Sequence, residues 1–153
     1  MATSNLKQVV VILVEDEVGV RTAMKMLLEV YGYRVEAFAS ANEALAGSRY
    51  CAPAQIADAS NRHSAVIVSD VRMPGLDGFE FLSVLRKQNV TVPFVLVSGH
   101  CSKDELSRGL ALGAQGFLSK PYEPNDLCAL IEEITSEAAV SDSDYPVAAN
   151  IRD

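Results

Sequence analysis

The chain has 153 residues, of which 49% are hydrophobic and 22% are charged, a composition typical of one globular domain. Its net charge is −7 and its 13 lysines and arginines are scattered, so the concentrated basic surface that direct binding of nucleic acid requires is absent from the sequence. The first aliphatic run, 9–14, is too short for a membrane span and wrongly flanked for a signal peptide, which predicts a cytoplasmic protein without a membrane partner.

Apolar runs alternate with helical periods five times along the chain, which predicts a parallel sheet covered by helices on both faces. Residues 9–14 form the first predicted strand, and the acids Glu15 and Asp16 follow it directly. Gly32 ends the first predicted helix, and residues 34–39 form the second strand. The first helix is predicted by apolar residues at helical spacing: Val20, Met24, Leu27, Leu28 and Tyr31.

The segment that joins the second helix to the third strand lacks a clear period. Ser40 and Glu43 form a capping box that opens the second helix. From residue 47 to residue 64, Ala, Ser, Asn and Pro dominate, and we interpret 47–64 as an insertion. A helix-to-strand connection lies at the amino-terminal edge of a parallel sheet, so we do not expect this insertion to shape a site at the opposite edge.

Asp70 ends the third predicted strand, 66–70, and a turn that contains Pro74 and Gly75 follows it. An apolar strand that delivers a carboxylate to its carboxyl end and then breaks at Pro-Gly places that carboxylate in the crevice where open parallel sheets bind ligands. The last two predicted strands, 93–97 and 116–119, also end in polar motifs: Ser98-Gly99 and Lys120-Pro121.

Three further helices are predicted around these strands. Asp77 caps the third helix, and Ser102 with Glu105 forms a capping box for the fourth, which Gly113 ends. Pro124 begins the fifth helix. Inward-facing apolar residues are predicted on the third and fifth helices: Phe81, Leu82, Leu85, Leu127, Leu130, Ile131 and Ile134.

Four motifs, each closing an apolar strand, occur in a fixed order: Glu15-Asp16, Asp70 before Pro74-Gly75, Ser98-Gly99 and Lys120-Pro121. From about residue 9 to residue 134 the chain resembles the response-regulator receiver domain of the CheY-like superfamily. The Ser98-Gly99-His100 run and the Val71-Arg72-Met73-Pro74-Gly75 run resemble the branch typified by nitrogen-fixation regulators.

The resemblance implies a flavodoxin-like, doubly wound α/β fold, with a five-stranded parallel sheet in the order 2-1-3-4-5 and five helices. It divides the chain into an N-terminal extension, a receiver domain, and a flexible tail or linker stub: 1–8, 9–137 and 138–153.

The first and third strands are neighbours in this order, so Glu15, Asp16 and Asp70 should converge at one edge of the sheet. Like charges this close repel one another and a hard divalent cation relieves the repulsion, so Mg²⁺ is the expected cofactor. The resemblance implies that Asp16, Asp70 and the backbone carbonyl of Arg72 hold the metal, while Glu15 acts through water.

The resemblance also makes Asp70 the phosphoacceptor, which takes a phosphoryl group from a phosphohistidine. Lys120 and the Ser98 hydroxyl would contact the phosphoryl oxygens, and Gly99 would keep the entrance open. Phe117 matches the position of an aromatic switch ring, which moves inward when Ser98 is drawn toward the phosphoryl group.

The remaining site residues have supporting roles. Arg72 and His100 are expected to border the mouth of the site and to modulate the lifetime of the phosphorylated state. Pro74, Gly75 and Pro121 are expected to be structural, with the Lys120-Pro121 peptide bond cis, as in many members of the family.

The implied partners are a histidine kinase or histidine phosphotransfer protein, and an output domain or protein bound through the face of the fourth helix, fifth strand and fifth helix. A phosphorylation-dependent dimer also stays open. A receiver-like interaction module that works unphosphorylated would be favoured by a missing acid or lysine, and none is missing. A phosphatase of the haloacid dehalogenase type would need a second acid two residues after the nucleophile, where Arg72 stands. We therefore predict a phosphoacceptor domain of two-component signal transduction rather than an enzyme.

Overall fold

The strands of a single parallel sheet lie side by side in the order β2-β1-β3-β4-β5-β6. The computed structural model describes residues 9–52, 65–140 and 151–152. The five predicted strands are present in the predicted order 2-1-3-4-5, and a two-residue sixth strand extends the sheet beside β5. The strands have these bounds: β1 (Val10–Val14), β2 (Arg34–Phe38), β3 (Ala65–Asp70), β4 (Phe94–Ser98), β5 (Gly116–Ser119) and β6 (Ile151–Arg152).

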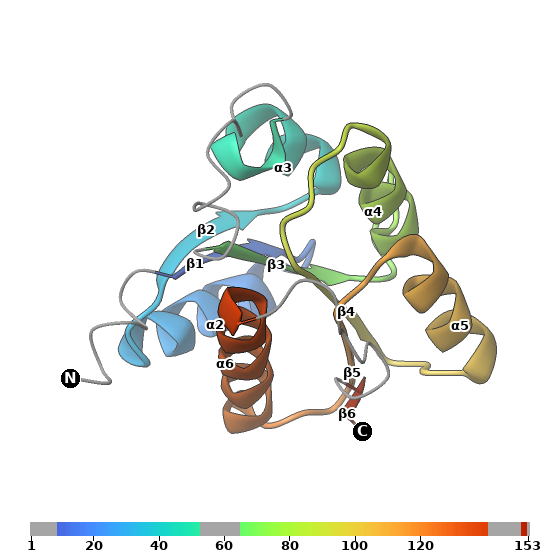
Figure 1. The fold of residues 1–153 in the computed structure, drawn as a ribbon. Helices are drawn as coiled ribbons and strands as arrows, with labels where there is room; N and C mark the ends of the chain where they lie inside the picture. The colour runs from blue at the N-terminus through green and yellow to red at the C-terminus, as the bar shows by residue number, and fades with distance from the viewer. Residues whose placement is uncertain (1–8, 53–64, 141–150, 153) are drawn as a thin grey trace.

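The described helices cover both faces of the sheet (Figure 1), so the doubly wound architecture is confirmed. α2 (Val18–Val30) and α6 (Pro124–Val140) lie on one face. The opposite face carries the other described helices: α3 (Ala41–Gly47), the 3₁₀ helix η1 (Arg49–Cys51), α4 (Gly78–Lys87) and α5 (Lys103–Leu112). The helices α2 to α6 are the five that the sequence predicts.

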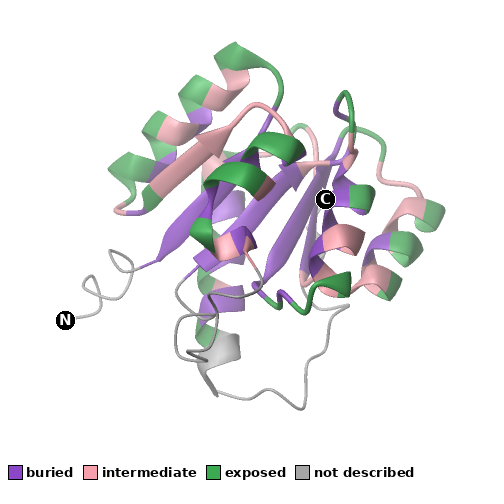
Figure 2. Ribbon diagram, turned by 90° about the horizontal axis from the view of Figure 1, so that it is seen from above, coloured by how far each residue is buried: buried purple, intermediate pink, exposed green. Residues whose placement is uncertain are grey.

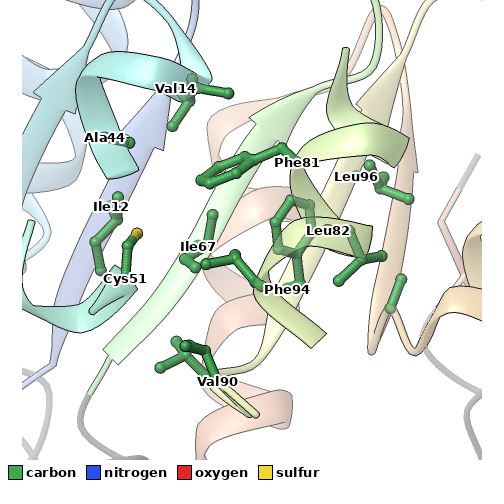
Figure 3. Packing of buried hydrophobic residues seen from close by; sticks show 14 of the residues in the cluster. Ile12, Val14, Ala44, Cys51, Ile67, Phe81, Leu82, Val90, Phe94 and Leu96 are labelled. Atoms are coloured by element: carbon green, nitrogen blue, oxygen red, sulfur yellow. The ribbon is translucent and has the colours of Figure 1, made fainter. Parts of the chain in front are cut away.

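The inner strands β1, β3, β4 and β5 are buried on both faces, which explains why they are nearly continuous apolar runs, whereas the edge strand β2 is only partly buried (Figure 2). Successive strand residues point to opposite faces and enter two separate hydrophobic cores. In the core beneath α3 and α4, the rings of Phe81 and Phe94 meet edge to face with their centroids 5.4 Å apart (Figure 3). All seven apolar residues predicted to face inward on the third and fifth helices are fully buried.

The predicted helix ends are mostly confirmed. Asp77 and Glu80 form a reciprocal capping box at the start of α4. Gly32 and Gly113 have φ angles of 104° and 99°, which suit glycine at the ends of α2 and α5. Ser40 caps α3 as predicted, although the Glu43 carboxylate accepts from the N–H of residue 39 instead of from that of Ser40.

One sequence-based expectation differs from the structure. Leu27 and Tyr31 are 37% and 38% exposed, because the buried stripe of α2 is centred on Met24 and Leu28. Within the predicted tail, α6 continues to Val140 and Ile151–Arg152 pairs with β5, while 141–150 and 153 lie outside the described residues, so the division at residue 138 stays a prediction. The free edge of β5 offers backbone hydrogen-bonding groups that a short segment can satisfy without any sequence period.

Part of the predicted domain division lies outside the described residues: 1–8 and 53–64. The described start of the predicted insertion forms the end of α3 and the η1 helix. Among the described residues, no helix is long and apolar enough to cross a membrane.

Candidate functional site

Three carboxylates converge at the carboxyl edge of the sheet, as the sequence predicts. β1 and β3 are parallel neighbours with Val14 opposite Ser69, so the residues that follow each strand emerge side by side. One carboxylate oxygen from each of Glu15, Asp16 and Asp70 lies within 4.8 Å of the others. The Arg21 guanidinium on α2 donates to the backbone carbonyl of Glu15 over 2.8 Å and so fixes the loop that carries two of these acids.

Lys120 brings a positive charge to this cluster from the end of β5. Its Nζ lies 3.2 Å from Asp70 Oδ2 and 3.7 Å from Glu15 Oε1. Its backbone N–H donates to the carbonyl of Ser98, and the Lys120-Pro121 peptide bond is cis, as the resemblance implied. The ammonium group is therefore held over the phosphoacceptor position that the sequence predicts.

Burial is the largest influence on the pKa values of Asp70 and Glu15. It raises the pKa of Asp70, while Lys120 opposes the rise and Asp16 adds to it. Burial also raises the pKa of Glu15, against the opposing hydrogen bond from the Glu17 backbone N–H. Both acids are thus more costly to ionise in the fold than in water, which is the situation that a bound cation relieves.

The donor set of the acidic cluster fits Mg²⁺. The cluster presents carboxylate oxygens, the ligands that hard divalent cations prefer. One oxygen from each of the three acids lies within 4.8 Å of the others, close enough for a single ion to draw them together. Glu15, Asp16 and Asp70 could hold the ion, and the contribution of the Arg72 carbonyl stays a prediction.

Ser98 is fully buried at the end of β4, one residue beyond the pairing of Val97 with Asp70. Its hydroxyl donates to Glu105 Oε1 over 2.8 Å and accepts from the His100 N–H over 3.0 Å. A Cβ added at the neighbouring Gly99 would meet nothing within 4 Å, in accord with an open entrance. The hydroxyl is thus hydrogen-bonded to α5. To donate to a phosphoryl group on Asp70, it must first break its hydrogen bond to Glu105.

Glu105 is the site residue that sequence reasoning missed. The sequence identified it only as the second half of a capping box, and that part of the prediction is wrong. Ser102 caps α5 through the Glu105 backbone N–H, but the Glu105 carboxylate accepts from Ser98 and from Arg72 Nη2, the latter over 2.7 Å. Arg72 is 68% exposed, and His100 is also exposed beside the entrance.

Three glycines occupy places near the site where a side chain would clash or strain the backbone. A Cβ at Gly78 would lie 2.6 Å from the Asp70 carbonyl oxygen, so only glycine lets α4 begin against the end of β3. Gly75 has a φ of 78°, which agrees with its predicted structural role in the turn. Phe117 is 1% exposed, and a Cβ at Gly109 would lie 3.4 Å from its ring, so the ring is already inward against α5 while Ser98 is bonded to Glu105. Its movement on phosphorylation stays a prediction.

Replacing Asp70 with asparagine should raise the thermal midpoint of the metal-free protein. The raised pKa of Asp70 means that its ionised form is less stable in the fold than in the unfolded chain, so the charge costs stability at neutral pH. Thermal unfolding with a chelator present tests this, and a lower midpoint for Asp70→Asn would contradict it. For the wild type, Mg²⁺ at roughly tenfold excess over its Kd should add about 1.4 kcal/mol to the free energy of unfolding.

Comparisons with known proteins agree with this geometry. Residues 11–132 match the response regulator receiver domain. The transcriptional regulatory protein FixJ of Bradyrhizobium diazoefficiens is 31% identical over 141 residues, which cover 90% of this chain and 62% of that protein. The C4-dicarboxylate transport transcriptional regulatory protein DctD of Rhizobium meliloti is 33% identical over 117 residues, which cover 76% of this chain and 23% of that protein.

A solved structure also resembles this chain over most of its length. The chemotaxis protein CheY4 of Vibrio cholerae superposes with a TM-score of 0.68 at 30% identity, over 83% of this chain and 98% of that one. This chain therefore spans a whole receiver domain of known structure, but less than two thirds of the length of the two curated regulators.

Proposed function

The chain belongs to the response regulator receiver domain family, and we propose that Asp70 accepts a phosphoryl group from a phosphohistidine donor, with Mg²⁺ bound beside it. The donor would be a histidine kinase or a histidine phosphotransfer protein. The observation that carries the proposal is the Lys120 ammonium, 3.2 Å from the Asp70 carboxylate inside a cluster of three acids. The cytoplasmic location expected from the sequence stays a prediction.

The chemistry follows from these positions. A carboxylate oxygen of Asp70 attacks phosphorus in line, and the bond from phosphorus to the donor's imidazole nitrogen breaks, with the electron pair leaving on that nitrogen. When bound, Mg²⁺ would supply positive charge to the phosphoryl oxygens. Lys120 attracts the same oxygens as a point charge, and the Ser98 hydroxyl donates to one of them after transfer.

We further propose that phosphorylation changes the face formed by α5, β5 and α6, which would bind an output domain or protein. Ser98 at the end of β4 is bonded to α5, and the inward Phe117 ring of β5 packs beside Gly109 of the same helix. A movement of Ser98 would therefore reach this face through direct contacts. The matched regulators FixJ and DctD are transcriptional regulatory proteins, which supports an output of that kind. A phosphorylation-dependent dimer stays open.

Incubation with acetyl phosphate and Mg²⁺, followed by intact mass measurement, tests the proposed function. The wild-type protein should gain one phosphoryl group, and a chelator added before the donor should prevent the gain. An unmodified mass at full folding, or a gain that is indifferent to the chelator, would contradict the proposal.

The double variant Arg72→Ala/His100→Ala should lose phosphate severalfold faster than the wild type. Hydrolysis needs a water in line with the bond from Asp70 to phosphorus, and neither side chain is suited to orient it, while Arg72 is large enough to obstruct it. Its guanidinium, paired with Glu105, stands beside Ser98 at the entrance. The decay of the phosphorylated mass after donor removal measures the effect, and unchanged or slower decay would reject the shielding role.

A further inference from the structure

Glu105 makes a contact that the proposed phosphorylation must break. The contact is with the Ser98 hydroxyl, which carries a single proton for donation. In the structure that proton goes to Glu105 Oε1 over 2.8 Å. A phosphoryl oxygen on Asp70 would need the same proton, so Glu105 and the phosphoryl group compete for it.

The Glu105 carboxylate is well placed to hold Ser98. It lies in the first turn of α5, where the partial positive charge of the helix terminus favours an anion. Its side chain is 14% exposed, and its second oxygen accepts from Arg72 Nη2 over 2.7 Å. A hydrogen bond to an ionised acceptor is about twice as strong as one between neutral groups. The bond to Ser98 is therefore a strong competitor rather than an incidental contact.

We infer that Glu105 is a positioning residue that holds the Ser98 hydroxyl on α5 and so opposes the phosphorylated state of Asp70. The inference rests on the proposed function. It adds that the balance between the two states is set by a carboxylate outside the acidic cluster, acting through Ser98. The same contact joins Ser98 directly to α5, so its loss on phosphorylation frees the first turn of a helix on the proposed output face.

Beryllofluoride with Mg²⁺, which mimics a phosphoryl group on a carboxylate, is the probe for the test. Its affinity can be measured by fluorine NMR for the wild type, Glu105→Gln, Ser98→Ala and the double variant. Glu105→Gln keeps the size of the side chain and the backbone N–H that Ser102 caps, but it weakens the hold on Ser98. We expect it to bind beryllofluoride about tenfold more tightly, equivalent to about 1.4 kcal/mol. A substitution that only damaged the fold would weaken binding instead.

Two comparisons separate this role from a general effect of charge. Asp104→Asn removes an equal charge from the same turn at an exposed position and should change the affinity by about twofold or less. In the Ser98→Ala background, Glu105→Gln should lose most of its effect, because the shared proton is gone. An equal gain in that background, or no gain in the wild-type background, would overturn the inference.

The outcome for the wild type distinguishes the two proposals. If the wild type binds beryllofluoride and Glu105→Gln behaves like Asp104→Asn, the inference fails and the proposed function stands. If the folded wild type binds no beryllofluoride with Mg²⁺, the proposed function fails and the inference fails with it.

Discussion

Asparagine at position 70 should abolish the Mg²⁺-dependent uptake of a phosphoryl group. The amide oxygen is neutral and a far weaker nucleophile than a carboxylate, and the substitution removes one of the three charges that attract the metal. Because the side chain keeps its shape and can still accept a hydrogen bond from Lys120, the loss should be specific to the chemistry. Intact mass after incubation with acetyl phosphate and Mg²⁺ measures it.

Asp77→Asn is the matched control for this variant. It makes the same chemical change at the N-cap of α4, at the end of the connection that follows Asp70, and asparagine is as good an N-cap as aspartate. Its labelling should therefore match that of the wild type. If Asp70→Asn were labelled as fully as Asp77→Asn, Asp70 would not be the phosphoacceptor.

The second large effect concerns stability, and it involves Arg86. This α4 side chain donates four hydrogen bonds: to the carbonyls of Val90, Val92 and Gly113 and to the side-chain oxygen of Gln115. Burial lowers its pKa to about 10, so it remains protonated at neutral pH. The Gln115 oxygen also accepts from the Phe94 N–H, so this one guanidinium joins the end of α4 to the starts of β4 and β5.

Arg86→Met should lower the free energy of unfolding by about 2 to 4 kcal/mol, because it leaves several partly buried carbonyl oxygens without their donor. Lys87→Met removes the same charge from the next, exposed position of the helix and should change stability by about 0.5 kcal/mol or less. Denaturant unfolding of both variants gives the comparison. Equal stability of the two variants would show that water replaces the Arg86 hydrogen bonds at little cost.

The parts of the fold that sequence predicts are those with a local pattern. The strands stand out as apolar runs because both faces of the sheet are covered, and Asp77 is recognisable as a cap from the residues that follow it. The convergence of Glu15, Asp16 and Asp70 follows from one rule, that parallel strands end at a common edge. The apolar runs and the cap are local patterns, whereas the adjacency of β1 and β3 follows from the resemblance to the receiver family.

The contacts that sequence missed join residues far apart in the chain. Arg72 meets Glu105 across 33 positions, and Arg86 meets Gly113 across 27. The spacing of Ser102 and Glu105 predicts a capping box, which assigns the Glu105 carboxylate to the helix terminus rather than to Ser98. β6 is two residues long, too short to show a period, and depends on the edge of β5 for its backbone partners.

Locating the modified residue is the most direct test of this account. After incubation with acetyl phosphate and Mg²⁺, borohydride reduces an aspartyl phosphate to homoserine, and peptide mass mapping then identifies the position. We predict homoserine at residue 70 alone, and none when Mg²⁺ is chelated before the donor is added. Modification at Glu15, Asp16 or any other residue, with Asp70 intact, would contradict the assignment of Asp70 as the phosphoacceptor.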